Sequence, residues 1–155
     1  MTSYRRILLV EDKAKDVELT LAALSEHNLA NKVAVARDGV EALDYLYCRG
    51  QFADRHDGHP AVVLLDIKMP RLNGLDVLRQ MKADARLRQI PVVMLTSSRE
   101  EPDLLSSYEL GVNAYVVKPV DFLQFEEAAK QVGMFWAILN EPPRTNMPSQ
   151  QNKSS

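Results

Sequence analysis

The sequence places side chains that could do chemistry directly after short apolar segments. Four such segments end in Glu11-Asp12, in Asp66, in Thr96 and in Lys118. An unbroken apolar run of this length is typical of a strand buried on both faces of a sheet. The carboxyl ends of parallel strands lie at one edge of a sheet, where ligands bind in open α/β folds. We therefore expect these five side chains to converge.

Three carboxylates and a lysine in one crevice favour phosphoryl chemistry. The carboxylates repel one another, and this repulsion raises the pKa of one or more of them unless a cation neutralises the cluster. Mg²⁺ prefers oxygen ligands and binds one or two carboxylates together with a phosphate oxygen. A carboxylate such as Asp66 can also act as a nucleophile and form an aspartyl phosphate. Mg²⁺ and Lys118 would then stabilise the charge on the transferring group, and Thr96 could hydrogen-bond to it.

Alternating strand and helix patterns would position these residues. Each apolar strand is followed by a segment with apolar residues at helical spacing, and the strands are predicted at 6–10, 32–36, 61–65, 91–95 and 114–117. This alternation predicts an α/β fold with a parallel sheet between two layers of helices. Asp38 is expected to cap the second helix. The last helix is predicted to begin near Asp121 and to run through Leu139.

Length and composition predict one globular domain. The chain has 155 residues, of which 46% are hydrophobic, and a net charge of −2 that argues against nucleic-acid binding by bulk electrostatics. We expect a domain over 5–139 and a flexible tail over 140–155, because the tail is polar without periodicity. The single cysteine fits a reducing compartment, and the N-terminus lacks the apolar length of a signal peptide or membrane span. These features predict a cytoplasmic protein.

Taken together, these motifs resemble the receiver domain of two-component response regulators, from residue 5 to about 139. The resemblance rests on a set of residues at family spacing, namely Glu11-Asp12, the segment 64–70 that contains Asp66 and Pro70, Gly74, Thr96-Ser97, Tyr115 and Lys118-Pro119. It implies the doubly wound, flavodoxin-like (βα)5 fold with strand order 2-1-3-4-5. It also implies a structural role for Pro70 and Gly74, and a cis peptide bond before Pro119.

The resemblance also implies a role for each site residue. Asp66 would accept a phosphoryl group from a histidine of a sensor kinase. Mg²⁺, or Mn²⁺ in its place, would be bound by Asp12, Asp66 and the backbone carbonyl of Lys68, with Glu11 acting through water.

Three further residues would hold or report the phosphoryl group in such a domain. Thr96 and Lys118 would hold it, and Tyr115 would swing inward as Thr96 moves. The protein would not be an enzyme beyond its own phosphotransfer and slow autodephosphorylation.

A narrower resemblance is to the stand-alone regulators of cyanobacterial and bacterial phytochromes. It rests on the long connection 47–60, the junction 118–122 with Phe125, and Phe135-Trp136. It implies a phytochrome histidine kinase as the partner.

The end of the last helix is apolar nearly all round, which is typical of an interface. We expect a homodimer or a kinase contact there, formed by Phe122, Met134, Phe135, Trp136 and Ile138. The alternative is that residues 140–147 fold back over this end.

Plainer interpretations exist for single residues. A lone aspartate after a strand is often a helix cap, a lone lysine such as Lys118 is often solvated, and Tyr115 alone would be packing. His56 and His59 are better explained as solvated loop residues than as a metal site, and Cys48 as structural.

The predicted function is a phosphorylation-dependent switch that signals by protein contact. One alternative is a relay that passes the phosphoryl group to a histidine phosphotransfer protein. An aspartate-nucleophile phosphatase would carry a second aspartate two residues after the nucleophile, where this chain has Lys68. A nucleotide- or flavin-binding module would need a glycine-rich loop after the first strand, where this chain is acidic. A receiver that signals without phosphorylation would not need the phosphoryl-acceptor residues, which are all present in this chain.

Overall fold

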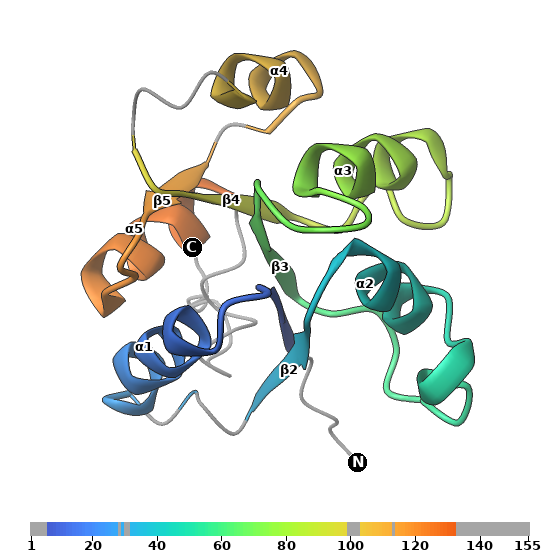
Figure 1. The fold of residues 1–155 in the computed structure, drawn as a ribbon, viewed down its shortest axis with the longest axis horizontal. Helices are drawn as coiled ribbons and strands as arrows, with labels where there is room; N and C mark the ends of the chain where they lie inside the picture. Colours follow the sequence, from blue (N-terminus) through green and yellow to red (C-terminus); the bar gives the residue numbers. More distant parts are fainter. Residues whose placement is uncertain (1–5, 28, 30–31, 99–102, 113, 133–155) are drawn as a thin grey trace, which may run out of the picture.

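One parallel sheet with helices on both faces forms the described part of the chain (Figure 1). The computed structural model describes residues 6–27, 29, 32–98, 103–112 and 114–132. The strands are β1 (Ile7–Val10), β2 (Val33–Ala36), β3 (Val62–Asp66), β4 (Val92–Thr96) and β5 (Tyr115–Val117). Their order is β2-β1-β3-β4-β5 and all neighbouring pairs are parallel. The predicted doubly wound α/β fold and its strand order are confirmed.

The helices divide into two layers that bury separate apolar clusters. They are α1 (Ala14–Ser25), α2 (Gly39–Leu46), α3 (Gly74–Ala83), α4 (Asp103–Glu109) and α5 (Phe122–Gln131), with a short 3-10 helix η2 (Gly50–Phe52) after α2. Helices α1 and α5 cover one face of the sheet, and α2, α3 and α4 lie on the other (Figure 1).

Strand β1 shows why the apolar runs do not alternate with polar residues. Its residues Ile7 and Leu9 pack in the cluster under α1 and α5, whereas Leu8 and Val10 pack in the cluster under α2 and α3. Both faces of the strand are therefore buried, and all four side chains have no exposed surface. Each such side chain contributes about 1.5–3 kcal/mol of burial free energy.

Three helices begin at a side-chain cap, but α1 does not. Asp38, Asn73 and Asp121 accept the backbone N–H three residues later, at 2.9, 3.0 and 2.8 Å. The predicted cap at Asp38 is confirmed. At the start of α1 the N-cap position is Lys13, which makes no side-chain cap hydrogen bond. The acidic pair before it is therefore available for another role.

The segment between α2 and β3 is an ordered connection rather than an open loop. It contains η2, and the Arg55 guanidinium donates hydrogen bonds to the backbone carbonyls of Tyr45 and Gly58. Within the described residues, one cluster of side chains could hold a metal ion, and neither His56 nor His59 belongs to it.

Parts of the predicted last helix and its interface lie outside the described residues. Helix α5 begins at Phe122, next to the predicted start near Asp121, but it ends at Gln131 with Val132 as its C-cap, short of the predicted end at Leu139. Met134, Phe135, Trp136, Ile138 and the tail 140–155 lie outside the described residues. Phe122 is described: it packs partly against the core and stacks on His27 with ring centroids 3.5 Å apart.

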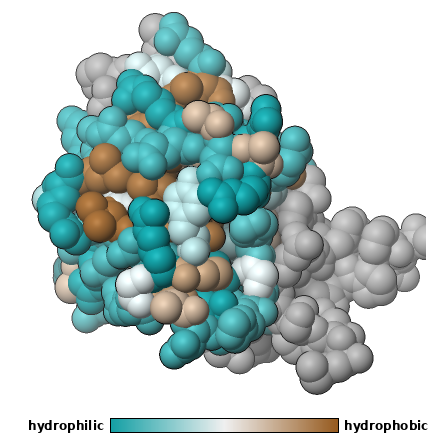
Figure 2. Space-filling view, turned by 90° about the vertical axis from the view of Figure 1, so that its right-hand side faces the viewer, coloured by the Kyte–Doolittle hydropathy of each residue, from teal (hydrophilic) through white to brown (hydrophobic). Residues whose placement is uncertain are grey.

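The face of the molecule that carries α2 and α3 is mostly hydrophilic (Figure 2). Figure 2 views the molecule from the side of α2 and α3, and this side is largely teal with smaller brown areas. The large apolar side chains that are exposed belong instead to α1, α4 and α5, namely Leu19, Tyr108 and Leu123. Within the described residues, none of the helices has the length and apolar character needed to cross a membrane.

Candidate functional site

The strand order brings the predicted residues to one edge of the sheet. Asp66 ends β3 and Thr96 ends β4, while Lys118 directly follows β5. Glu11 and Asp12 directly follow β1, the neighbour of β3 on the other side. Because all strands are parallel, these five residues lie at the carboxyl edge, where α/β folds bind ligands.

Three carboxylates form a compact acidic cluster. Glu11, Asp12 and Asp66 each offer an oxygen within 4.8 Å of the other two. Asp66 Oδ2 and Asp12 Oδ1 are buried without a hydrogen-bond partner. A buried acceptor without a partner is costly, and a divalent cation would satisfy both oxygens at once. The donor set therefore fits Mg²⁺ or a similar hard cation.

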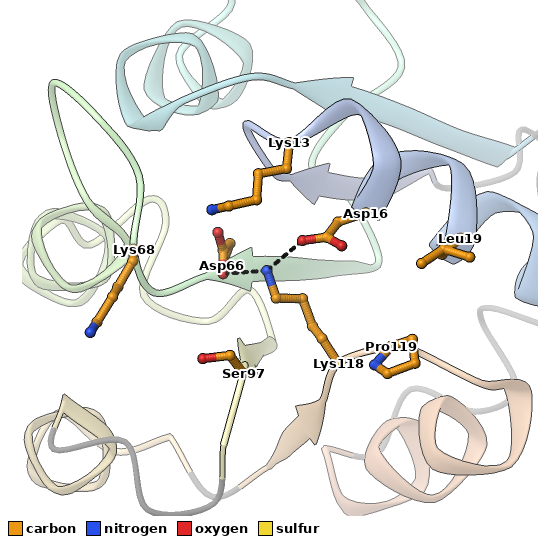
Figure 3. A pocket seen from close by; sticks show the side chains of 8 residues that line it. All are labelled: Lys13, Asp16, Leu19, Asp66, Lys68, Ser97, Lys118 and Pro119. Atoms are coloured by element: carbon orange, nitrogen blue, oxygen red, sulfur yellow. Dashed lines mark hydrogen bonds and ion pairs between the residues drawn. The ribbon is translucent and has the colours of Figure 1, made fainter.

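The Lys118 ammonium lies among three carboxylates. Its Nζ is 3.1 Å from Glu11 Oε1, 3.0 Å from Asp16 Oδ2 and 3.2 Å from Asp66 Oδ1. Figure 3 shows the lysine reaching from the end of β5 to Asp66 on one side and to Asp16 of α1 on the other. Burial acts to lower the pKa of Lys118, but the hydrogen bond to Asp16 and the charges of Asp66 and Glu11 outweigh it and raise the pKa. The lysine is therefore a permanent cation beside Asp66.

Ionisation of the Asp66 carboxyl group is disfavoured by its surroundings. Burial and the negative charge of Glu11 raise its pKa to about 7, although the nearby Lys118 acts in the opposite direction. The side chain is only 5% exposed, so water does little to stabilise its charge. A bound cation would favour the ionised form that nucleophilic attack requires.

Thr96 ends β4 and Tyr115 begins β5, on the side of β3 away from β1. The buried Thr96 hydroxyl donates to the backbone carbonyl of Ser98 at 2.7 Å and accepts the Ser98 N–H at 3.2 Å. Tyr115 is partly buried and packs edge-on against Tyr108 of α4, with ring centroids 6.3 Å apart. Neither placement tests the expected coupled movement of the two side chains.

A cavity of about 380 Å³ opens beside Asp66 (Figure 3). Its walls are Lys13, Asp16, Leu19, Asp66, Lys68, Ser97, Lys118 and Pro119. The sequence reasoning did not identify Lys13, Asp16 or Leu19 as site residues. Asp16 carries no signal of its own in the sequence, because an acidic residue in the first turn of a helix is ordinary.

The loop after β3 depends on a glycine. A Cβ atom at Gly74 would lie 2.2 Å from the backbone oxygen of Asp66, so no side chain fits there. The Gly74 N–H also donates to the carbonyl of Ile67 at 2.8 Å. This close approach fixes the start of α3 against the residue that bears the candidate acceptor. Pro70 is exposed in the same loop, and Lys118–Pro119 is a cis peptide bond, as the resemblance implied.

Comparisons with known proteins agree with this geometry. The family model of the response regulator receiver domain matches residues 7–130. Response regulator Rcp1 of Synechocystis sp. is 34% identical over 84% of this chain and 87% of its own length. A structure of the bacteriophytochrome response regulator AtBRR is 61% identical, covers 90% of this chain and 100% of its own, and has a TM-score of 0.83. The Mn²⁺-bound form of Rcp1 is 33% identical, covers 86% of this chain and 94% of its own, and has a TM-score of 0.67. The chain belongs to the response regulator receiver domain family, a family of signalling regulators, and is related to the phytochrome response regulators.

Proposed function

We propose that this chain accepts a phosphoryl group on Asp66 from a phytochrome-type sensor histidine kinase. The observation that carries the proposal is the environment of Asp66. It is a buried carboxylate at the carboxyl edge of the sheet, with one oxygen lacking a partner and the other 3.2 Å from a lysine ammonium. The similarity to bacteriophytochrome and cyanobacterial phytochrome response regulators supports the choice of kinase.

In the proposed transfer, an ionised oxygen of Asp66 attacks the phosphorus of a phosphohistidine. The new O–P bond forms as the P–N bond breaks, and the imidazole nitrogen keeps the electron pair. Lys118 balances the negative charge on the phosphoryl oxygens. Thr96 would supply a further hydrogen bond once its hydroxyl leaves Ser98.

The acidic cluster would hold the divalent cation that this chemistry needs. Asp12, Asp66 and the backbone carbonyl of Lys68 would bind Mg²⁺, with Glu11 acting through water. When bound, the ion neutralises charge on the carboxylates and on the phosphoryl oxygens. Mn²⁺ is a reasonable substitute, since a Mn²⁺-bound form of the related Rcp1 is known.

The phosphorylated chain would act as a switch rather than as an enzyme with turnover. Movement of Thr96 and Tyr115 would report the phosphoryl group to the surface near α4. The predicted output is a protein contact, including a homodimer through the last helix, with slow autodephosphorylation ending the signal. Transfer to a histidine phosphotransfer protein is the alternative, and a cytoplasmic location stays a prediction.

Labelling by two donors tests this proposal. Acetyl phosphate with MgCl₂, and separately an autophosphorylated bacteriophytochrome kinase, should each add one phosphoryl group by intact-protein mass spectrometry. Asp66→Asn should remove the label from both donors. Asp76→Asn, which removes a carboxylate of α3 that pairs with Arg79 at the surface, is the matched control. Labelling of the Asp66→Asn protein to the wild-type extent would contradict the proposal. Labelling by acetyl phosphate but not by the kinase would contradict a phytochrome-type kinase as the phosphoryl donor.

A further inference from the structure

Asp16 makes the shortest of the three contacts to Lys118. It lies in the first turn of α1, and its Oδ2 is 3.0 Å from the lysine Nζ. Its side chain is 24% exposed, against 13% for that of Lys118, so the ion pair is sheltered but reaches the cavity. Figure 3 shows Asp16 and Asp66 on opposite sides of the ammonium group.

The three acceptors of Lys118 are not equivalent. Glu11 and Asp66 also belong to the acidic cluster that would hold a cation, whereas Asp16 does not. A cation would draw on the oxygens of Glu11 and Asp66, and a phosphoryl group would occupy an oxygen of Asp66. Asp16 is therefore the one partner in this set that can keep its hydrogen bond to Lys118 in every state of the site.

We propose that Asp16 is a positioning residue that anchors Lys118 beside Asp66. This anchoring weakens the interaction of Lys118 with the carboxylates that would bind the cation. This inference rests on the proposed function. Lysine is a flexible side chain with a point charge and three donors, so its position depends on the acceptors around it.

Removal of Asp16 should make Lys118 a competitor of the metal. The lysine would keep Glu11 and Asp66 as its remaining charged acceptors in the described structure, and a cation would have to displace it from both. Loss of the Asp16 charge would also weaken cation binding directly, with or without Lys118. The two contributions can be separated because only the first depends on the lysine.

A double-mutant cycle on Mg²⁺ affinity separates them. Titration calorimetry with MgCl₂ on the unphosphorylated full chain would compare wild type, Asp16→Asn, Lys118→Met and the double variant. Asp16→Asn should weaken Mg²⁺ binding about fivefold when Lys118 is present, as expected for a partly exposed charged hydrogen bond. It should weaken binding less than about twofold in the Lys118→Met protein. An equal loss in both backgrounds, or no loss in either, would overturn the proposal.

Two controls keep the result interpretable. Glu18→Gln removes a carboxylate from the exposed side of α1 and should leave Mg²⁺ affinity within about twofold of wild type. If Asp16→Asn unfolds, Asp16→Ala gives the same cycle, because alanine favours the helix. Labelling of wild type but not of Asp66→Asn tests the proposed function separately. If labelling is normal but the Asp16 and Lys118 substitutions show no coupling in Mg²⁺ affinity, the proposed role of Asp16 is rejected and the proposed function stands.

Discussion

Asp38 and Asp66 are two buried aspartates at the carboxyl ends of two strands of the same sheet, yet they have opposite electrostatic environments. Asp38 follows β2 and is 8% exposed, and Asp66 ends β3 and is 3% exposed. The Asp38 carboxylate accepts the backbone N–H of Glu41 and the Nε–H of Arg71, each at 2.9 Å. Asp66 instead keeps one oxygen without a hydrogen-bond partner.

Burial acts to raise the pKa of both aspartates, and their hydrogen-bond and charge partners differ. Burial acts to raise the pKa of Asp38, but the hydrogen bonds from Glu41 and Arg71 and the Arg71 charge bring it below its ordinary value. The pKa of Asp66 rises to about 7, because burial and the charge of Glu11 outweigh the effect of Lys118. A buried carboxylate with satisfied oxygens is a structural cap, whereas one with an unsatisfied oxygen is a candidate site.

The largest expected effect comes from the cation beside Asp66. Lys118→Ala should lower the rate of labelling by acetyl phosphate about a hundredfold, since it removes a charge that stabilises the transferring group. Lys82→Ala, at the end of α3, is the control and should label like wild type. A Lys118→Ala protein that labels at the wild-type rate would show that Asp66 does not depend on the lysine for catalysis.

The close approach of α3 to Asp66 predicts the next effect. Gly74→Ala should cost about 3 kcal/mol of unfolding free energy, because the added Cβ meets the Asp66 carbonyl and the loop must shift. Urea unfolding measures this loss, with Gln80→Ala at an exposed position of the same helix as the control. A change below about 0.5 kcal/mol would mean that the loop adapts freely.

The raised pKa of Asp66 predicts a pH-dependent gain in stability on its removal. The pKa of Asp66 is about 7 in the folded protein and 3.8 when unperturbed, so its ionisation opposes folding as pH rises between these values. Without divalent cations, Asp66→Asn should therefore stabilise the protein by about 2 kcal/mol at pH 8 and by little near pH 4. Urea unfolding across this range measures the difference. A constant difference, or destabilisation at pH 8, would contradict the assigned environment of Asp66.

Removal of the Asp38 carboxylate should have the smallest effect on stability, with the opposite sign. Asp38→Ala should cost about 1 kcal/mol at pH 7, because α2 loses its cap and Arg71 loses its partner. The lowered pKa of Asp38 means that its contribution is present above the unperturbed value of 3.8 and is lost as pH falls through the folded value. Labelling of the Asp38→Ala protein by acetyl phosphate should be unchanged. A Mg²⁺-dependent loss of labelling would contradict the assignment of Asp38 as a structural cap without a role at the phosphoryl site.

The sheet and its edge could be predicted because the three inner strands, β1, β3 and β4, are buried on both faces. That burial leaves unbroken apolar runs, and the polar residue that ends each run marks the edge of the sheet. Asp66, Thr96 and Lys118 are visible in this way. The cap at Asp38 was also predictable, since the Asp-Gly turn precedes a helical pattern.

Contacts between distant residues could not be predicted in the same way. The Asp16 and Lys118 side chains meet across 102 positions in sequence, and an acidic residue in the first turn of a helix is ordinary. The hydrogen bonds of Thr96 to Ser98 and the unsatisfied oxygen of Asp66 also depend on the exact placement of side chains. Predicted boundaries were less accurate: the strands predicted at 32–36 and 114–117 begin at Val33 and Tyr115 in the structure.

Chemical mapping of the phosphorylated residue tests the central claim most directly. Borohydride reduces an aspartyl phosphate to homoserine, and peptide mass spectrometry then identifies the position that carried it. After treatment with acetyl phosphate and MgCl₂, we expect homoserine at residue 66, none at Asp38 or Asp12, and none when Mg²⁺ is removed. Homoserine at another aspartate, or its absence from residue 66 in a labelled protein, would contradict the assignment of Asp66 as the phosphoryl acceptor.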